Sequence, residues 1–382
     1  MNTIKISVRN LVEFILRSGN LTTSSGLKDP DAMQEGARIH KKIQRKMKSG
    51  YQAEVALSIT VPISYDDINF EICVEGRADG IFTNETGYNI DEIKGVYREL
   101  ASIENPIEVH RAQALCYGYI WACEHSLEGI GIQMTYCHIP TEEIKRFNEY
   151  IDFKTLEKWF YELLHEYAKW ASWELKWHEK RNISIKNIEF PFEYRPGQNT
   201  LVKGVYQTIL RKKRLYIEAP TGVGKTISTI FPAVKAMGEE LSEKLFYLTA
   251  KTITRTVAQD AFNILLDNGV HLKYVTITAK EKICILDKPT CNPGSCPRAL
   301  GHFDRVNDAV FDVITHEEHI TREIVSTYAE KHNVCPFEMC LDISTWVDAV
   351  IGDYNYAFDP NACLKRFFGT DTTSNNYIFL ID

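Results

Sequence analysis

The chain has 382 residues, enough for two or three domains of ordinary size. Its hydrophobic fraction of 44% and charged fraction of 25% are those of a globular protein, and they exclude a disordered or fibrous chain. The net charge of −7 argues against a protein covered by nucleic acid, although local basic surface can still bind DNA.

No apolar run approaches the roughly 20 residues that a membrane helix needs. The N-terminus, MNTIKISVRN, lacks the apolar core of a signal peptide. We therefore expect a cytoplasmic protein that does not bind a membrane. Ten cysteines in that compartment favour metal binding over disulfides wherever they cluster. Nothing in the composition identifies a protein partner.

Hydrophobic periodicity predicts alternating helices and strands in the first 180 residues. Ser7 is the expected N-cap of the first helix. We expect a break in the second strand at Gly76, with a turn from Gly76 to Asp79. An aromatic stripe on the last helix is expected to pack in the core. The expected helices span 7–17, 31–48, 109–122 and 156–177, and the expected strands span 53–63, 68–83, 88–94 and 130–139.

Three polar residues stand out among these strands. Glu92 and Lys94 are two positions apart, so they share one face of a strand while Ile93 points to the other. With Asp79 on a neighbouring strand, two carboxylates can hold Mg²⁺ or Mn²⁺. A nearby lysine can position or deprotonate an attacking water and stabilise charge on a phosphate. The alternative for Glu92 and Lys94 is an exposed ion pair on an edge strand.

Four motifs follow one another in this region and together suggest a family. Their order resembles the RecB-type branch of the PD-(D/E)XK nuclease superfamily, over about residues 30–140. The motifs are Gly36-x-x-x-His40, Gly76-x-x-Asp79, Glu92-x-Lys94 and Gln113-x-x-x-Tyr117.

The resemblance implies a role for each polar motif residue. His40, Asp79 and Glu92 become metal ligands, together with the Ile93 carbonyl, and Lys94 becomes catalytic. Gln113 and Tyr117 would support the site or the DNA backbone, whereas Asp91 should face away from it. The cysteines of this region are neither clustered nor flanking, so we expect small buried apolar residues at Cys73, Cys116, Cys123 and Cys137.

The stretch 215–226, LYIEAPTGVGKT, is typical of a P-loop. Leu215 to Ile217 is expected to form a buried strand, and a helix is expected to begin after the glycines. Gly222 and Gly224 allow the backbone N–H groups to turn toward a phosphate, and the helix N-terminus favours the same anion. Lys225 can reach the β- and γ-phosphates of ATP, and the Thr226 hydroxyl can hold Mg²⁺.

The P-loop has neighbours that resemble helicase motifs. Upstream, the charged stretch 178–186 fits a linker, and Gln198 resembles the glutamine that reads the adenine edge. Downstream, Lys251 and Thr252 resemble the motif that contacts the nucleic-acid backbone. Strands are expected at 244–249 and 273–279.

Five cysteines interrupt the alternation of strands and helices, with the spacing C-x6-C-x4-C-x38-C-x4-C from Cys284 to Cys340. The paired C-x-x-C knuckles of zinc ribbons are absent, although zinc and free thiols remain alternatives. Turn residues between the cysteines suit thiolates that converge on a cluster. An insert at this place resembles the XPD/DinG helicase family. The resemblance implies a [4Fe–4S] cluster on four of them, with Cys340 as a packing residue; the four are Cys284, Cys291, Cys296 and Cys335.

The stretch 377–382 is an apolar strand ending in Asp382, which matches the first residue of the family's D-E-A-H box. We therefore expect a chain that lacks the glutamate activating water and the second motor lobe. Such a chain should bind nucleotide weakly, and neither hydrolyse ATP nor unwind DNA by itself.

We therefore expect an α/β fold in which a PD-(D/E)XK nuclease domain (1–180) and a linker (181–191) precede a first RecA-like helicase lobe (192–382), with a cluster insert at about 280–342. The resemblances imply a DNA-repair helicase of 5′-to-3′ polarity, driven by ATP and fused to a Mg²⁺- or Mn²⁺-dependent DNA nuclease. Its partner would be single-stranded or branched DNA. One alternative is a non-catalytic DNA-binding module with a redox-sensing cluster and a vestigial nuclease. Another is a zinc-stabilised nuclease without motor ancestry.

Overall fold

The computed structural model describes residues 2–22, 30–47, 50–85, 87–220, 222–368 and 376–382. Two compact units make up the chain: Met1–Ser18 with Thr23–Trp173, and Gly19–Thr22 with Glu174–Asp382. The domain limits expected at 180 and 192 stay predictions. No helix among the described residues is long and apolar enough to span a bilayer.

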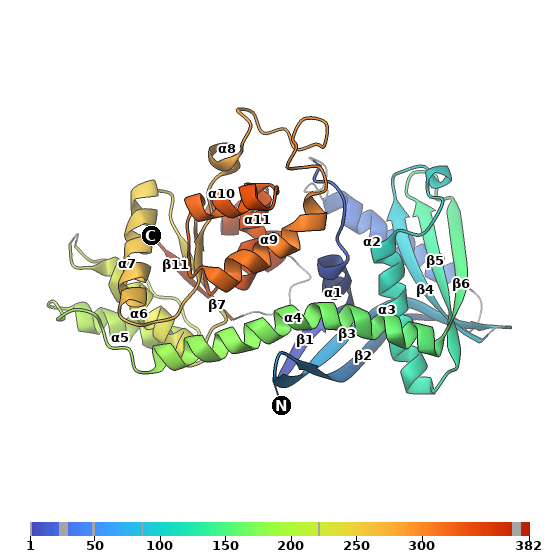
Figure 1. Ribbon diagram of the computed structural model, residues 1–382, viewed down its shortest axis with the longest axis horizontal. Coiled ribbons are helices and arrows are strands. Elements are labelled where there is room, and N and C mark those ends of the chain that lie inside the picture. Colours follow the sequence, from blue (N-terminus) through green and yellow to red (C-terminus); the bar gives the residue numbers. More distant parts are fainter. Residues whose placement is uncertain (1, 23–29, 48–49, 86, 221, 369–375) are drawn as a thin grey trace. The chain divides into compact units, whose positions relative to one another are not determined.

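The first unit is built on a six-stranded mixed sheet (Figure 1) with the order β1-β3-β4-β5-β6 and with β2 paired to β3. Its strands are β1 (Thr3–Ser7), β2 (Gln52–Tyr65), β3 (Ile68–Asn84), β4 (Gly87–Val96), β5 (Gly129–His138) and β6 (Ile144–Asp152). Its helices are α1 (Val8–Ile15), α2 (Pro30–Lys46), α3 (Glu108–His125) and the first part of α4 (Phe153–Lys186), with a 3₁₀ turn at Leu100–Ser102.

Local sequence explains most of these elements. The Ser7 hydroxyl accepts a hydrogen bond from the Asn10 amide and caps α1, as expected. Helix α3 is buried at every position from 112 to 122, because it packs on β4 and β5. Strands β1 and β6 were not expected. Strand β6 alternates exposed and half-buried positions, the pattern of an edge strand, and β1 is short.

Strand β3 has different neighbours along one of its edges. Its first half pairs with β1, up to Ser7 opposite Glu75, and its last part pairs with β4 from Gly80 opposite Asp91. The break and turn expected at Gly76 are wrong, since the strand runs straight through. A Cβ at Gly76 would lie 2.8 Å from the Tyr117 hydroxyl oxygen, so the glycine permits close packing of α3.

Helix α4 is 34 residues long, and the linker expected at 178–186 is its last part. The aromatic stripe packs in the core, as expected. Tyr167 and Trp170 are buried, and the Trp170 ring meets the Phe14 ring of α1 edge-on at 4.8 Å. The last part of α4 has many charged, exposed positions and few buried ones. Its sequence therefore lacks the apolar periodicity that predicts a helix.

The second unit holds a five-stranded parallel sheet with the order β11-β7-β10-β8-β9. Helices α6 and α7 share a core with this sheet, while α9, α10 and α11 pack on one another in the insert (Figure 1). The strands are β7 (Lys244–Leu248), β8 (Tyr274–Thr276), β9 (His319–Ile320), β10 (Ala349–Gly352) and β11 (Tyr377–Ile381). The helices are α5 (Gln198–Leu210), α6 (Lys225–Gly238), α7 (Thr252–Asp267), α8 (Lys280–Ile283), α9 (His302–His316), α10 (Arg322–Lys331), α11 (Pro336–Trp346), α12 (Asn355–Phe358) and α13 (Lys365–Phe368).

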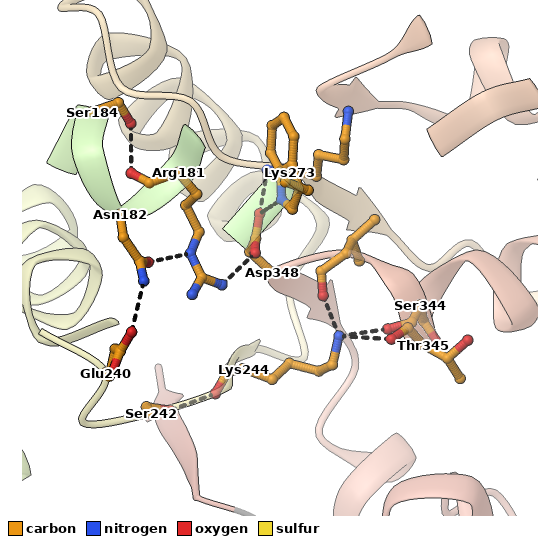
Figure 2. A network of polar contacts seen from close by, with 12 residues as sticks. Arg181, Asn182, Ser184, Glu240, Ser242, Lys244, Lys273, Ser344, Thr345 and Asp348 are labelled. Atoms are coloured by element: carbon orange, nitrogen blue, oxygen red, sulfur yellow. Dashed lines mark hydrogen bonds and ion pairs between the residues drawn. The ribbon is translucent and has the colours of Figure 1, made fainter. Parts of the chain in front are cut away.

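A buried polar network ties the end of α4 to this sheet (Figure 2). Asp348, directly before β10, accepts hydrogen bonds from Arg181 Nη1 at 2.6 Å and from the Lys273 amide at 2.8 Å. It also accepts one from Trp177 Nε1 at 2.9 Å. The side chains of Arg181 and Asp348 are only 4% and 3% exposed, so this is a desolvated ion pair.

A second buried cation closes the same end of the sheet. Lys244, the first residue of β7, donates from Nζ to the carbonyls of Ser344 at 3.0 Å and of Val347 (Figure 2). Burial lowers the pKa of Lys244 to about 8, although the charge of Asp348 opposes this shift. The polar network therefore pins the N-terminal ends of the strands and leaves their opposite ends available for a site.

The neighbouring cations Arg181 and Lys180 give a matched test of this network. We expect Arg181→Met to lower the local unfolding free energy by about 3 kcal/mol, because it leaves the Asp348 carboxylate buried without its charge partner. Lys180→Met should cost less than about 1 kcal/mol, since Lys180 is 51% exposed and 3.4 Å from Glu318. Hydrogen exchange at the Val350 amide of β10 measures both. Equal losses of unfolding free energy in the two variants would show that the buried Arg181–Asp348 pair stabilises the fold no more than an exposed ion pair does.

Candidate functional site

The first candidate site lies where β4 leaves β3. Pairing between the two strands stops at Asp91 opposite Gly80, and from Glu92 onward β4 pairs only with β5. The Ile93 amide therefore donates to a side chain, Asp79 Oδ2, at 2.8 Å. This parting of the strands opens the sheet at the position of Asp79.

Most of the residues expected at a nuclease site meet here. His40 Nδ1 of α2 lies 3.1 Å from Asp79 Oδ1. Lys94 Nζ donates to Glu92 Oε1 at 2.8 Å and to Gln113 Oε1 of α3 at 2.6 Å. The structure thus brings together residues from four separate elements, while their catalytic roles stay predictions.

The remaining two positions behave differently. Tyr117 packs over Gly76 and touches β3 rather than the Lys94 ammonium group. Asp91 has its own partners on the other face of β4, as expected: it accepts from Tyr51 at 2.9 Å and from Thr135 at 2.6 Å. Asp91 is therefore a buried structural carboxylate.

Burial dominates the electrostatics of this site. The Glu92 side chain is only 5% exposed, and desolvation raises its pKa although the Lys94 charge opposes that shift. Its Oε2 atom is buried without a hydrogen-bond partner among the described residues. Burial lowers the pKa of Lys94, but the Glu92 and Asp79 carboxylates together raise it by more. An ammonium group is thus held beside a buried carboxylate and is bonded to one of its two oxygens.

The pKa of His40 follows the same competition. Burial lowers it, and the hydrogen bond and charge of Asp79 raise it by more. Across the described ranges, no three His, Cys, Asp or Glu side chains are already arranged as ligands of one metal ion. The expected metal ligands are therefore close together but are not arranged around one metal position, and His40 contacts Asp79 directly.

The second candidate site is the P-loop. Gly222 and Gly224 have φ of +82° and +74°, the left-handed region that glycine adopts freely. Gly224 is the N-cap of α6, so the helix begins at Lys225 as expected. Lys225 Nζ donates to the Ala219 carbonyl at 2.8 Å and thus lies against the loop itself.

The strand expected before the P-loop is wrong. Residues 215–217 are irregular in the structure, and Tyr216 is 90% exposed. A parallel strand needs a hydrogen-bonded neighbour, and β11 pairs only with β7 within the described part of the chain. An apolar run alone does not supply that neighbour.

Two residues of the preceding segment hold the P-loop backbone. Gln198, at the start of α5, donates from Nε2 to the Val223 carbonyl at 3.2 Å and accepts from the Arg195 amide at 3.0 Å. The Arg195 guanidinium group donates to the Gly222 carbonyl. The expected adenine-reading role of Gln198 stays a prediction, and Arg195 is a contact that sequence reasoning missed.

Tyr247 of β7 joins Thr226, the expected Mg²⁺ ligand, to Asp382, the expected first residue of the D-E-A-H box. Its hydroxyl donates to Asp382 Oδ2 at 2.8 Å. Burial and the Asp382 carboxylate raise the pKa of Tyr247, and a hydrogen bond with Thr226 opposes this shift. Sequence reasoning missed Tyr247, because a tyrosine near the end of an apolar strand reads as core.

A groove lies at the start of α7, with a volume of about 450 Å³. Thr252, an expected DNA contact, is part of its wall, and Lys251 directly precedes that helix. Hydroxyl and amide groups of α7 and of the segment after β8 form much of the wall, including Thr256, Gln259, Asn263 and Thr278.

The third candidate site is a cavity in the insert. All four expected cluster ligands line it, namely Cys284, Cys291, Cys296 and Cys335. Cys340 is buried elsewhere, with its sulfur 3.9 Å from the Thr276 carbonyl oxygen, which fits the expected packing role. Burial raises the pKa of Cys335 to about 11. The cavity also includes Leu21, which is far from the insert in sequence.

Comparison with models of known protein families gives no match. Half of the chain is similar in sequence to curated helicase relatives. A "Regulator of telomere elongation helicase 1 homolog" of Caenorhabditis elegans is 24% identical over 50% of this chain, and its Arabidopsis thaliana counterpart is 22% identical over 52%. This chain covers 23% of the length of each of these two relatives.

Two solved structures were also matched. The crystal structure of SSO0001 gives a TM-score of 0.27 at 18% identity, over 42% of this chain and 75% of that one. "Truncated XPD" gives 0.35 at 15% identity, over 48% and 51%. The sequence similarity to the helicase homologues supports the expectation of an XPD-like helicase region.

Proposed function

We propose that this chain joins a metal-dependent DNA nuclease domain to a first motor lobe of an ATP-driven, XPD/DinG-like DNA helicase. The observation that carries the nuclease half is the buried Glu92, whose Oε2 has no partner while Lys94 binds its other oxygen. An unpaired buried carboxylate oxygen is costly unless a cation completes it. The similarity to helicase homologues supports the motor half.

The residues of the first site fit a Mg²⁺ or Mn²⁺ ion. Asp79 and Glu92 supply hard oxygen ligands, and His40 supplies a nitrogen once its contact with Asp79 is exchanged. When bound, the ion would activate water and neutralise charge on the scissile phosphate of DNA. Lys94, oriented by Glu92 and Gln113, stabilises the negative charge that develops there.

Cleavage of labelled single-stranded DNA with Mn²⁺ or Mg²⁺ tests the nuclease half. We expect Asp79→Asn and Lys94→Met to lower the rate by at least about 100-fold, because a ligand or the charge stabiliser is lost. Glu75→Gln is the matched control: it makes the same kind of change at an exposed position of β3 and should leave the rate unchanged. Wild-type protein that binds DNA without cutting it would favour the vestigial alternative.

The second unit has the parts of a nucleotide site. Gly222 and Gly224 turn the loop toward the N-terminus of α6, where backbone N–H groups favour a phosphate. The Tyr247 hydroxyl is hydrogen-bonded to both Thr226 and Asp382. These two side chains are therefore close enough to suit binding of the same Mg²⁺ ion. The groove beginning at Thr252 offers hydroxyl and amide donors, which suit sequence-independent contacts with the DNA backbone.

Two glycine substitutions test the nucleotide site. Gly224→Ala should weaken binding of a labelled ATP analogue by at least about tenfold, because alanine is strained at positive φ. Its Cβ would also lie 2.8 Å from Gln198 Nε2. Gly204→Ala adds the same methyl group in the middle of α5, where no atom lies within 4 Å, and should leave binding unchanged. Binding that survives Gly224→Ala would remove the P-loop from the proposal.

The insert fits an iron–sulfur cluster. Four cysteines from loops and helix ends line one cavity, while Cys340 lies outside it. Thiolates in this number and without C-x-x-C knuckles suit a [4Fe–4S] cluster, which would tie the insert together. Zinc is the alternative occupant, and the two metals leave different signatures.

Metal analysis of anaerobically purified protein tests the insert. We expect brown protein with broad visible absorption, iron and sulfide. Cys291→Ser should lose most of the iron because a ligand is removed, and Cys340→Ser should keep it. A colourless wild-type protein with stoichiometric zinc would contradict the iron–sulfur cluster and support zinc as the bound metal.

A further inference from the structure

A short segment from the N-terminal sequence belongs to the second unit. Residues Gly19–Thr22 follow α1 in the chain, yet they group with Glu174–Asp382 by their contacts. Leu21 is only 5% exposed and packs in one apolar cluster with Cys291, Cys296 and Cys335. It is the one residue of the described cavity wall that comes from outside the insert.

Hydrogen bonds hold this segment against the first turn of α9 and the turn before it. The Gly19 amide donates to Asp304 Oδ1 at 2.7 Å, and the Phe303 amide donates to the Gly19 carbonyl at 3.0 Å. The amide and the carbonyl of Gly19 are therefore both held by the first turn of α9.

The next two residues continue the same contact toward the cysteines. The Leu21 amide donates to the Ala299 carbonyl at 2.8 Å, three residues after Cys296. The Asn20 side chain accepts from the Gly301 amide at 2.7 Å. Four hydrogen bonds therefore position one apolar side chain over the thiols, which is more order than an ordinary surface loop needs.

We propose that Gly19–Thr22 is the cover of the cysteine site, and that Leu21 shields the bound cluster from water and oxidants. This inference rests on the proposed iron–sulfur cluster. An apolar wall controls solvent access to a metal centre and thereby its stability. Cluster binding and closure of the cover are thermodynamically linked. A protein whose cover opens more readily therefore releases the cluster faster, and a bound cluster in turn favours the closed cover.

The rate of cluster loss tests the cover. Wild type, Leu21→Ala and Leu300→Ala are purified anaerobically as full chains, and iron release to a chelator in air is followed by the fall in visible absorption. We expect Leu21→Ala to release iron about tenfold faster than wild type, because opening becomes easier and a solvent path remains. Leu300→Ala makes the same change at a 56% exposed leucine outside the cavity, and should match wild type.

Asn20→Ala is a second test in case the Leu21 variant misfolds. Asn20 is exposed, and its substitution removes only the hydrogen bond from the Gly301 amide. It should speed iron release by a few-fold. Amide exchange at Leu21 and Phe303 should also be slower in cluster-loaded protein than in protein stripped of metal. Equal release rates in all four proteins overturn the cover while leaving the cluster in place. A wild type without iron overturns the cluster itself.

Discussion

The parting of β4 from β3 is the constraint on which the first unit depends. Once pairing stops at Gly80 and Asp91, the amide of Ile93 has no strand partner on that side and takes the Asp79 carboxylate instead. A buried N–H group left unpaired would be costly, so Asp79 stabilises the split as well as facing it. The same split leaves Glu92 and Lys94 beyond the end of the pairing between β3 and β4, with Gln113 reaching Lys94 from α3.

The second unit separates its polar groups between the two ends of a parallel sheet. At the ends where strands begin, Asp348 is buried with Arg181 as its charge partner, and the buried Lys244 donates to backbone carbonyls. At the ends where strands finish, Tyr247 and Asp382 lie near the P-loop and share polar contacts. Ligands of open parallel sheets bind outside the carboxyl ends of the strands. The division of polar groups thus follows the functional polarity of the sheet.

The cysteine cavity depends on sequence segments far apart in the chain. The four expected ligands come from the insert, whereas Leu21 comes from the segment that follows α1 in the sequence. Hydrogen bonds of Gly19 with the first turn of α9 and of Leu21 with the Ala299 carbonyl make that distant segment part of the cavity wall. The lining of the cysteine cavity and the course of the N-terminal chain are therefore coupled through ordinary packing.

The sequence by itself determined the features that depend on local pattern. The cap at Ser7, the facing of Glu92 and Lys94, the glycine turn before α6 and the common cavity of the four cysteines all follow from short spacings or motif order. Tertiary structure decided the rest. Leu215 to Ile217 is apolar but not a strand, because a strand requires a neighbour that pattern cannot supply. Gly76 lies in a continuous strand because Tyr117 packs against it, and Tyr247 and Leu21 acquired their places only through contacts with residues distant in sequence. Periodicity reports which side of an element is apolar, whereas partners across the fold decide what that side meets.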